Sequence, residues 1–179
     1  MTLSVVYVSD TGHVVGAVGV TGEPAPGTVA ALVGPALPLR VRLEDETAVL
    51  TLLSRRLAAL AADDEPGVFA DPLAFGVDQV VGADKTVTPK PVLLSLQPLT
   101  TPLVLDSEGL LVALPEPDLT KDTAVLVLLS DGADTRVLPG TIAQGQSSTI
   151  IRVSVDDGTY GVLVLVAGWA GRLEPVTKQ

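Results

Sequence analysis

Reactive side chains are almost absent from this sequence of 179 residues. It contains no cysteine, one histidine (His13), one methionine and one tryptophan (Trp169). Without cysteine the chain forms no disulfide and offers a metal no thiolate ligand, and one imidazole cannot supply a site built from several histidines. Covalent, redox and imidazole-based catalysis are therefore nearly excluded by composition. We expect no enzyme activity, no cofactor and no metal.

Basic residues and long hydrophobic runs are also scarce. The net charge is −10, whereas nucleic acids and anionic membrane surfaces are bound by Lys and Arg, so neither is an expected partner. The uncharged stretches at residues 24–39, 91–105 and 159–171 contain Gly or Pro and are shorter than the roughly 20 residues of a membrane span. The first residues lack the basic segment of a secretory signal. We therefore expect a cytoplasmic protein, either free or as part of a released particle.

Apolar residues and turn signals are abundant. Hydrophobic residues make up 47% of the chain, and short polar segments containing glycine separate the apolar runs, at residues 9–12, 106–109, 130–132 and 156–158. Asp and Ser side chains hydrogen-bond within tight turns and Gly accepts a positive φ, so each segment predicts a β-hairpin. Their recurrence predicts a mainly β fold with antiparallel strands.

Two segments depart from the β pattern. Residues 27–33 predict a short helix that Gly34 and Pro35 end. Residues 44–62 predict an amphipathic helix with an acidic first turn, because four leucines recur at helical spacing, namely Leu50, Leu53, Leu57 and Leu60. The alternative for this segment is a strand over residues 48–53 followed by a shorter helix.

A change in composition divides the chain. Residues 82–91 are rich in Pro, Thr and Lys and read as a linker. We therefore predict two domains. Residues 1–88 are expected to form an α+β domain with a hairpin, the short helix and the amphipathic helix 44–62. Residues 89–179 are expected to form an antiparallel β-sandwich domain.

Two strands expected in the second half, residues 124–129 and 162–166, are apolar at every position. A half-exposed antiparallel strand alternates apolar with polar residues, so these strands are covered on both faces. The cover is either the N-terminal half of the same chain or another subunit. In the second case an apolar sheet face is a contact surface, whose expected residues are Val125, Val127, Leu129, Val162, Val164, Val166 and Trp169.

A pattern near the C-terminus runs from an alternating strand (residues 151–155) through the turn Asp157-Gly158 and Tyr160 to alternating valines and Gly168-Trp169. It resembles the end of a carboxypeptidase-regulatory-like (transthyretin-like) β-sandwich module, and residues 104–109 are similar to that family's opening strand and turn. Trp169 stands where the family usually has Tyr or Phe. The resemblance implies a seven-strand sandwich without catalytic residues, which serves as an accessory, adhesive or assembly domain.

The few motifs that could carry chemistry are incomplete. Asp10-Thr11-Gly12 resembles the signature of aspartic proteases, but that reaction needs two carboxylates sharing a proton, and no second such tripeptide exists. We interpret it as a hairpin turn and keep a peptidase using Asp10 as a remote alternative. His13 is interpreted as the first residue of a strand. Acidic clusters at residues 44–46, 63–65 and 156–157 lack the alternating spacing of a calcium loop.

Together these features predict a non-enzymatic structural protein, a subunit of a larger homo- or hetero-oligomeric particle held by apolar β faces. A phage-tail-like particle is one concrete form. The expected partners are other protein subunits, either copies of this chain or different ones. The alternative is a ligand- or carbohydrate-binding β-sandwich module. Because such sites usually present aromatic platforms and aromatic residues form only 3% of the chain, a small-molecule ligand is the less expected partner.

Overall fold

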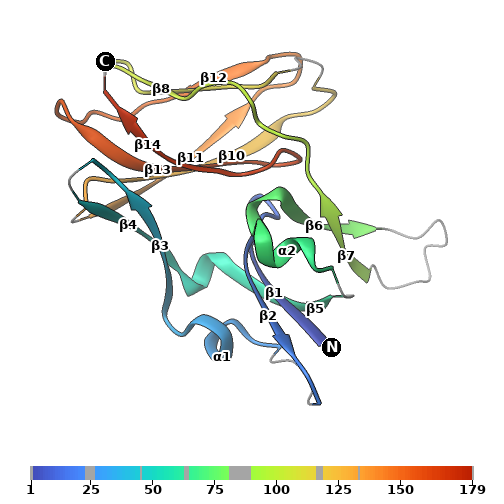
Figure 1. Cartoon of the computed structure of the whole chain (residues 1–179). Coiled ribbons are helices and arrows are strands. Elements are labelled where there is room, and N and C mark those ends of the chain that lie inside the picture. Colours follow the sequence, from blue (N-terminus) through green and yellow to red (C-terminus); the bar gives the residue numbers. More distant parts are fainter. Residues whose placement is uncertain are drawn as a thin grey trace.

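Strands dominate the computed structural model, which confirms the mainly β fold (Figure 1). The structure describes residues 2–22, 27–44, 46–62, 65–80, 90–115, 119–132 and 134–178. None of the helices in these ranges is long and apolar enough to cross a membrane. The first half contains β1 (Thr2–Val8), β2 (Val14–Val20), α1 (Val29–Val33), β3 (Ala36–Arg42), β4 (Thr47–Leu53), η1 (Ser54–Arg56), β5 (Leu57–Ala62), α2 (Gly67–Ala70), η2 (Pro72–Ala74), β6 (Phe75–Val80) and β7 (Lys90–Ser95). The second half contains β8 (Val104–Leu105), β9 (Leu110–Ala113), β10 (Thr123–Ser130), β11 (Thr135–Ile142), β12 (Ser148–Ile151), β13 (Thr159–Val166) and β14 (Arg172–Thr177).

The second half forms a two-layer β-sandwich. A three-stranded sheet of order β12-β9-β8 faces a four-stranded sheet of order β11-β10-β13-β14, and a large apolar core lies between them (Figure 1). The chain crosses between the sheets in a Greek-key manner, as in immunoglobulin-like sandwiches. The buried Tyr160 at the start of β13 donates its hydroxyl to the carbonyl of Asp156 at 2.9 Å. This bond has the form of the tyrosine corner that fixes the crossing between sheets in such folds.

Three of the four predicted hairpin turns are confirmed. Residues 9–12 join β1 to β2, residues 106–109 join β8 to β9, and residues 130–132 lie between β10 and β11, each pair antiparallel. The Asp106 carboxylate accepts hydrogen bonds from two turn amides, and Gly109 has a φ of 138°. The turn at 156–158 is not a hairpin. Strand β12 pairs with β9 and β13 pairs with β10, because residues 152–156 carry the chain from one sheet to the other.

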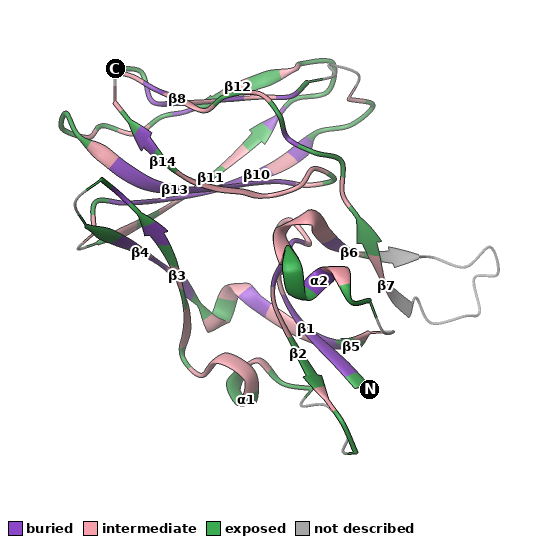
Figure 2. Cartoon of the chain, viewed as in Figure 1, coloured by how far each residue is buried: buried purple, intermediate pink, exposed green. Residues whose placement is uncertain are grey.

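The β3–β4 hairpin adds a third layer to the sandwich. It packs on the outer face of the four-stranded sheet, where Leu126 and Leu128 of β10 meet Leu50 and Leu52 of β4. Gly161 of β13 allows this close approach, because a Cβ there would lie 2.8 Å from the Cβ of Ala48. The central strands β10 and β13 are therefore buried on both faces, as the purple segments of Figure 2 show.

A second, smaller sheet of order β2-β1-β5 lies beyond this hairpin (Figure 1). One of its faces packs on α2 and the β6–β7 hairpin around Leu3, Val5 and Val68. Residues Val6 and Val8 on the opposite face of β1 join the cluster that contains α1 and the β3–β4 hairpin. The predicted short helix is confirmed as α1, whose first turn is capped by the Thr28 hydroxyl and which Gly34 ends with a φ of 69°.

The amphipathic helix expected over residues 44–62 is wrong. The segment forms β4, the single turn η1 and β5, so the alternative was correct in its strand and wrong in its helix. In β4 every second residue is buried, namely Ala48, Leu50 and Leu52, and these side chains cover the sandwich. Burial on a neighbouring sheet thus overrides the helical spacing of the leucines. The expected linker at 82–91 lies outside the described residues except for Lys90 and Pro91 of β7, and the domain division at 88/89 stays a prediction.

Candidate functional site

The residues expected to form a contact surface lie inside the molecule. The six strand residues are at most 2% exposed and pack between the two sheets of the sandwich, namely Val125, Val127, Leu129, Val162, Val164 and Val166. The opposite face of the same strands is covered by the β3–β4 hairpin. Of the two alternatives for covering these strands, the structure shows the one in which the chain covers itself. None of the six is available to a partner in this structure.

Trp169, the seventh expected residue, lies in the β13–β14 turn and packs partly buried against the sandwich core. The two residues after it bind the first half of the chain and the segment between β7 and β8. Gly171 N–H donates to the Leu73 carbonyl at 2.8 Å, and Ala170 N–H donates to the Gln97 carbonyl at 2.6 Å. Trp169 thus belongs to the junction between the two halves, a position that its sequence surroundings did not indicate.

His13 completes this junction from the other side. It is fully buried, and its Nε2 lies 2.6 Å from the carbonyl oxygen of Trp169. A carbonyl only accepts, so Nε2 carries the proton and Nδ1, 2.9 Å from the Thr11 hydroxyl, accepts. Burial lowers the pKa of His13 from 6.5 to about 4, against the opposing effect of its hydrogen bonds to Trp169 and Thr11. The imidazole is therefore a neutral structural bridge and is not exposed as a base. His13 lies directly before β2, in a single bridge to Gly76, close to the strand start expected for it.

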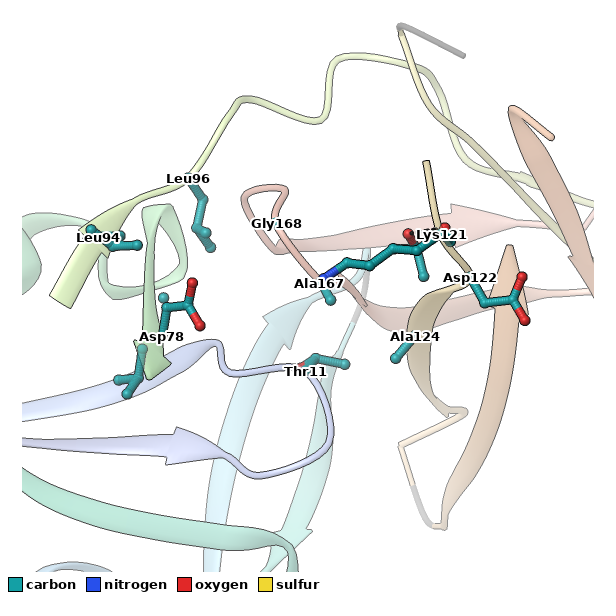
Figure 3. A pocket seen from close by; sticks show the side chains of 12 residues that line it. Thr11, Asp78, Leu94, Leu96, Lys121, Asp122, Ala124, Ala167 and Gly168 are labelled. Atoms are coloured by element: carbon teal, nitrogen blue, oxygen red, sulfur yellow. Dashed lines mark hydrogen bonds between the residues drawn. The ribbon is translucent and has the colours of Figure 1, made fainter. Parts of the chain in front are cut away.

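A cleft of about 440 Å³ opens beside this junction. Its walls come from β6, β7, the chain leading into β10, and the β13–β14 turn (Figure 3). Lys121 and Asp78 extend into it from opposite sides, and Leu94 and Leu96 form an apolar wall (Figure 3). The Lys121 ammonium makes no ion pair with any described residue. None of the described residues that line the cleft is aromatic, so they do not supply the stacking platform of a carbohydrate site.

The other residues considered for catalysis or metal binding are Asp10 and the acidic clusters. Asp10 forms an ion pair with Arg56 at 2.6 Å in the β1–β2 turn. Within the described ranges no three acidic or histidine side chains are grouped closely enough to hold a metal ion. Asp63 and Asp64, which belong to one of the acidic clusters, and Asp45, which belongs to another, lie outside the described residues.

The edges of the sheets differ in how they are protected. An exposed strand edge invites pairing with another chain, and proteins usually block it with charge, proline or a covering group. The edge strands β3, β7, β11 and β14 all contain such residues, namely Pro38, Arg40 and Arg42; Lys90 and Pro91; Arg136 and Pro139; and Arg172, Glu174 and Pro175. Strands β8 and β12 are short, and residues 12–13 before β2 pair with Gly76 and Val77 of β6.

Strand β4 is blocked by a single side chain. The Thr135 hydroxyl of β11 accepts a hydrogen bond from Thr51 N–H at 3.0 Å and donates one to the Val49 carbonyl at 3.2 Å. It thereby occupies both backbone groups that a partner strand would use at this point of the β4 edge. The cap joins residues more than 80 positions apart in the sequence.

Strand β5 has none of these protections. Its sequence, Leu-Ala-Ala-Leu-Ala-Ala, contains neither charge nor proline, and it pairs on one side only, with β1. The Ser9 N–H donates to the Arg56 carbonyl at 2.9 Å. In an antiparallel pair, residues whose backbone groups bond the neighbouring strand alternate with residues whose groups point away, so this bond identifies both sets in β5. The backbone groups of residues 58, 60 and 62 therefore point at β1, and those of Leu57, Ala59 and Ala61 point away. The Leu57 N–H donates to the Ser54 carbonyl at the end of η1. The Leu57 carbonyl and both backbone groups of Ala59 and Ala61 have no backbone partner among the described residues outside the strands.

Sequence reasoning missed this edge because the segment was interpreted as a helix. The signal that was present is the absence of charge over residues 57–62, between Arg56 and Asp63. Comparisons of the chain with protein-family models, with curated proteins and with solved structures found no match. The transthyretin-like resemblance therefore stays a prediction.

Proposed function

We propose that this chain is a non-enzymatic structural subunit that assembles with other protein chains, and that it does so along a strand edge. The observation that carries the proposal is the edge of β5, which contains neither charge nor proline and pairs on one side only. The opposite edge of the same sheet, β2, is also uncharged, but it contacts η2, α2 and β6. Main-chain hydrogen bonds along such an edge are a common way for one protein to add a strand to another. The apolar sheet faces are not the contact, because the chain covers them itself.

Two further features support a structural role. The only imidazole is buried and holds the two halves of the chain together, so it is not placed as a catalytic base. The acidic net charge of −10 keeps so apolar a chain from associating indiscriminately. Assembly would then depend on a defined edge of the molecule.

The test is the mass of the chain in solution, measured by size-exclusion chromatography with light scattering from low to high micromolar concentration. The proposal expects either self-association or a stable complex with a protein partner recovered with the purified chain. A chain that stays at its monomer mass of 18.3 kDa and recovers no partner would contradict it.

A ligand-binding module is the second candidate, and the cleft beside the junction favours it. The size of the cleft lies within the range of small-molecule sites. Gly168 lines it, and Trp169 is the next residue, so the single tryptophan reports on its occupancy. Titration of Trp169 fluorescence with a panel of sugars and of amphipathic anions tests this candidate, with a Lys121→Met variant as control for the anions. Unchanged fluorescence throughout would count against it.

A further inference from the structure

We infer that the occupant of the β5 edge is β5 of a second copy of this chain, paired antiparallel about a two-fold axis at Ala59. This inference rests on the proposed assembly function and names its partner. The two three-stranded sheets would then form one six-stranded sheet, of order β2-β1-β5 continued by β5-β1-β2 of the second copy.

The direction of the backbone groups fixes the register. The outward groups belong to Leu57, Ala59 and Ala61, and directly opposed residues that exchange two hydrogen bonds must both point outward. In an antiparallel pair with a two-fold axis at Ala59, Leu57 lies opposite Ala61 of the second copy and Ala59 lies opposite itself. Both backbone groups of Ala59 then find partners, and the Ala61 N–H meets the Leu57 carbonyl of the other copy. The Leu57 N–H keeps its bond to the Ser54 carbonyl.

The side chains are complementary in this register. Each leucine of one copy lies opposite an alanine of the other, Leu57 opposite Ala61 and Leu60 opposite Ala58. Large residues opposite small ones interdigitate without clash. The strand is thus self-complementary, as a symmetric interface between identical chains requires.

The charges flanking β5 agree with the antiparallel direction. Arg55 precedes the strand and Glu65 follows it, and neither forms an ion pair with another described residue. An antiparallel arrangement brings the basic start of β5 near the acidic end of the second copy's β5. A parallel arrangement would bring like charges together. The strand itself carries no charge, so no like charges face each other between the paired residues.

The absence of cysteine allows a direct test by disulfide trapping. In the proposed register the Cα atoms of the two Ala59 residues lie about 5.5 Å apart, within the span of a disulfide. The Ala59→Cys variant should therefore form a covalent dimer under mild oxidation. The matched control is Ala61→Cys, because residue 61 lies opposite residue 57, so its own counterpart is roughly 13 Å away. It should remain monomeric on a non-reducing gel.

The oligomeric state is measured in parallel. Wild type should reach twice the mass of 18.3 kDa in the micromolar range, since a single pair of strands makes a small interface. Ala61→Pro removes an outward N–H that β1 does not use and should halve that mass at equal concentration. Ala61→Ser keeps the N–H and should dimerise like wild type. Circular dichroism confirms that each variant is folded, and the trapping experiment does not depend on the proline variant.

The outcomes separate the inference from the function it rests on. Trapping at residue 59 alone, with a dimer that Ala61→Pro abolishes, supports the inference. A dimer that Ala61→Pro leaves intact, or trapping at residue 61, overturns the inference and leaves the assembly function standing. If the chain is a monomer that binds a different protein, and Ala61→Pro abolishes this binding, the inference is likewise overturned and the assembly function stands. A monomer without any partner overturns both.

Discussion

The burial of His13 makes the stability of the protein depend on pH in a defined window. In the unfolded chain its pKa is 6.5, and burial lowers it to about 4 in the folded chain. Above pH 6.5 the imidazole is neutral in both states and contributes no pH dependence. As the pH falls below 6.5 the unfolded chain binds a proton that the folded chain does not, so the free energy of unfolding decreases. The loss is complete near pH 4, where the folded chain is protonated too.

The size of this loss follows from the difference between the two pKa values. One pKa unit corresponds to about 1.4 kcal/mol, so the shift from 6.5 to about 4 amounts to about 3 kcal/mol. This is a large part of the stability of an ordinary domain. The cause is the burial of the imidazole, which disfavours its charged form, and the hydrogen bonds to Trp169 and Thr11 oppose this effect only in part.

The assay is denaturant unfolding from pH 7.5 to pH 4, for wild type and for His13→Gln. The glutamine amide can still donate to the Trp169 carbonyl but does not titrate. The other titratable groups are the same in both proteins, so the difference between the two reports on residue 13. The wild type should therefore lose about 3 kcal/mol more than the variant across this range. In the NMR spectrum the single imidazole should titrate near 4. An ordinary midpoint near 6.5, or a constant difference between the two proteins, would refute the reasoning.

Three substitutions test the packing of the sandwich by denaturant unfolding. Thr135→Val removes the cap of the β4 edge and should lower the free energy of unfolding by about 1–3 kcal/mol, because two backbone groups lose their partner. Thr135→Ser keeps the hydroxyl and should lower it much less. Equal losses in the two variants would contradict the cap. Gly161→Ala should cost about 1–3 kcal/mol through overpacking, and adding Ala48→Gly should recover most of it, since the two Cβ positions lie 2.8 Å apart. Tyr160→Phe removes the hydroxyl bond to Asp156 and should cost about 1 kcal/mol, and an unchanged midpoint would show that the corner bond is unimportant.

The parts of the fold that the sequence predicted are those set by local chemistry. The turn at 106–109 depends on the Asp106 side chain and on Gly109 with a positive φ, and the turn at 9–12 contains Gly12 with a φ of 78°, so their positions can be read directly. The helix α1 depends on Thr28 and Gly34 at its ends, which are equally local. Local turn chemistry does not say which strands a turn connects, and the turn at 156–158 was misassigned for that reason.

The parts that the sequence did not predict depend on distant contacts. The leucines of residues 44–62 fit a helix by spacing, and only the sandwich face that receives Leu50 and Leu52 makes β4 a strand. The candidate site was out of reach for the same reason. Whether an apolar strand is central or lies at an edge is decided by its neighbours: β10 lies between two strands and two layers, while β5 pairs on one side. The cap by Thr135 likewise becomes visible only in three dimensions.

The third layer also bears on how the molecule is made. The ribosome completes the β3–β4 hairpin at residue 53, well before it reaches β10 at residue 123 and β13 at residue 159. Chains fold from the N-terminus as they grow. The hairpin that covers the apolar outer face of the four-stranded sheet has therefore been synthesised before that face emerges from the ribosome. A fragment that begins after the hairpin would expose this apolar face throughout its synthesis and would aggregate.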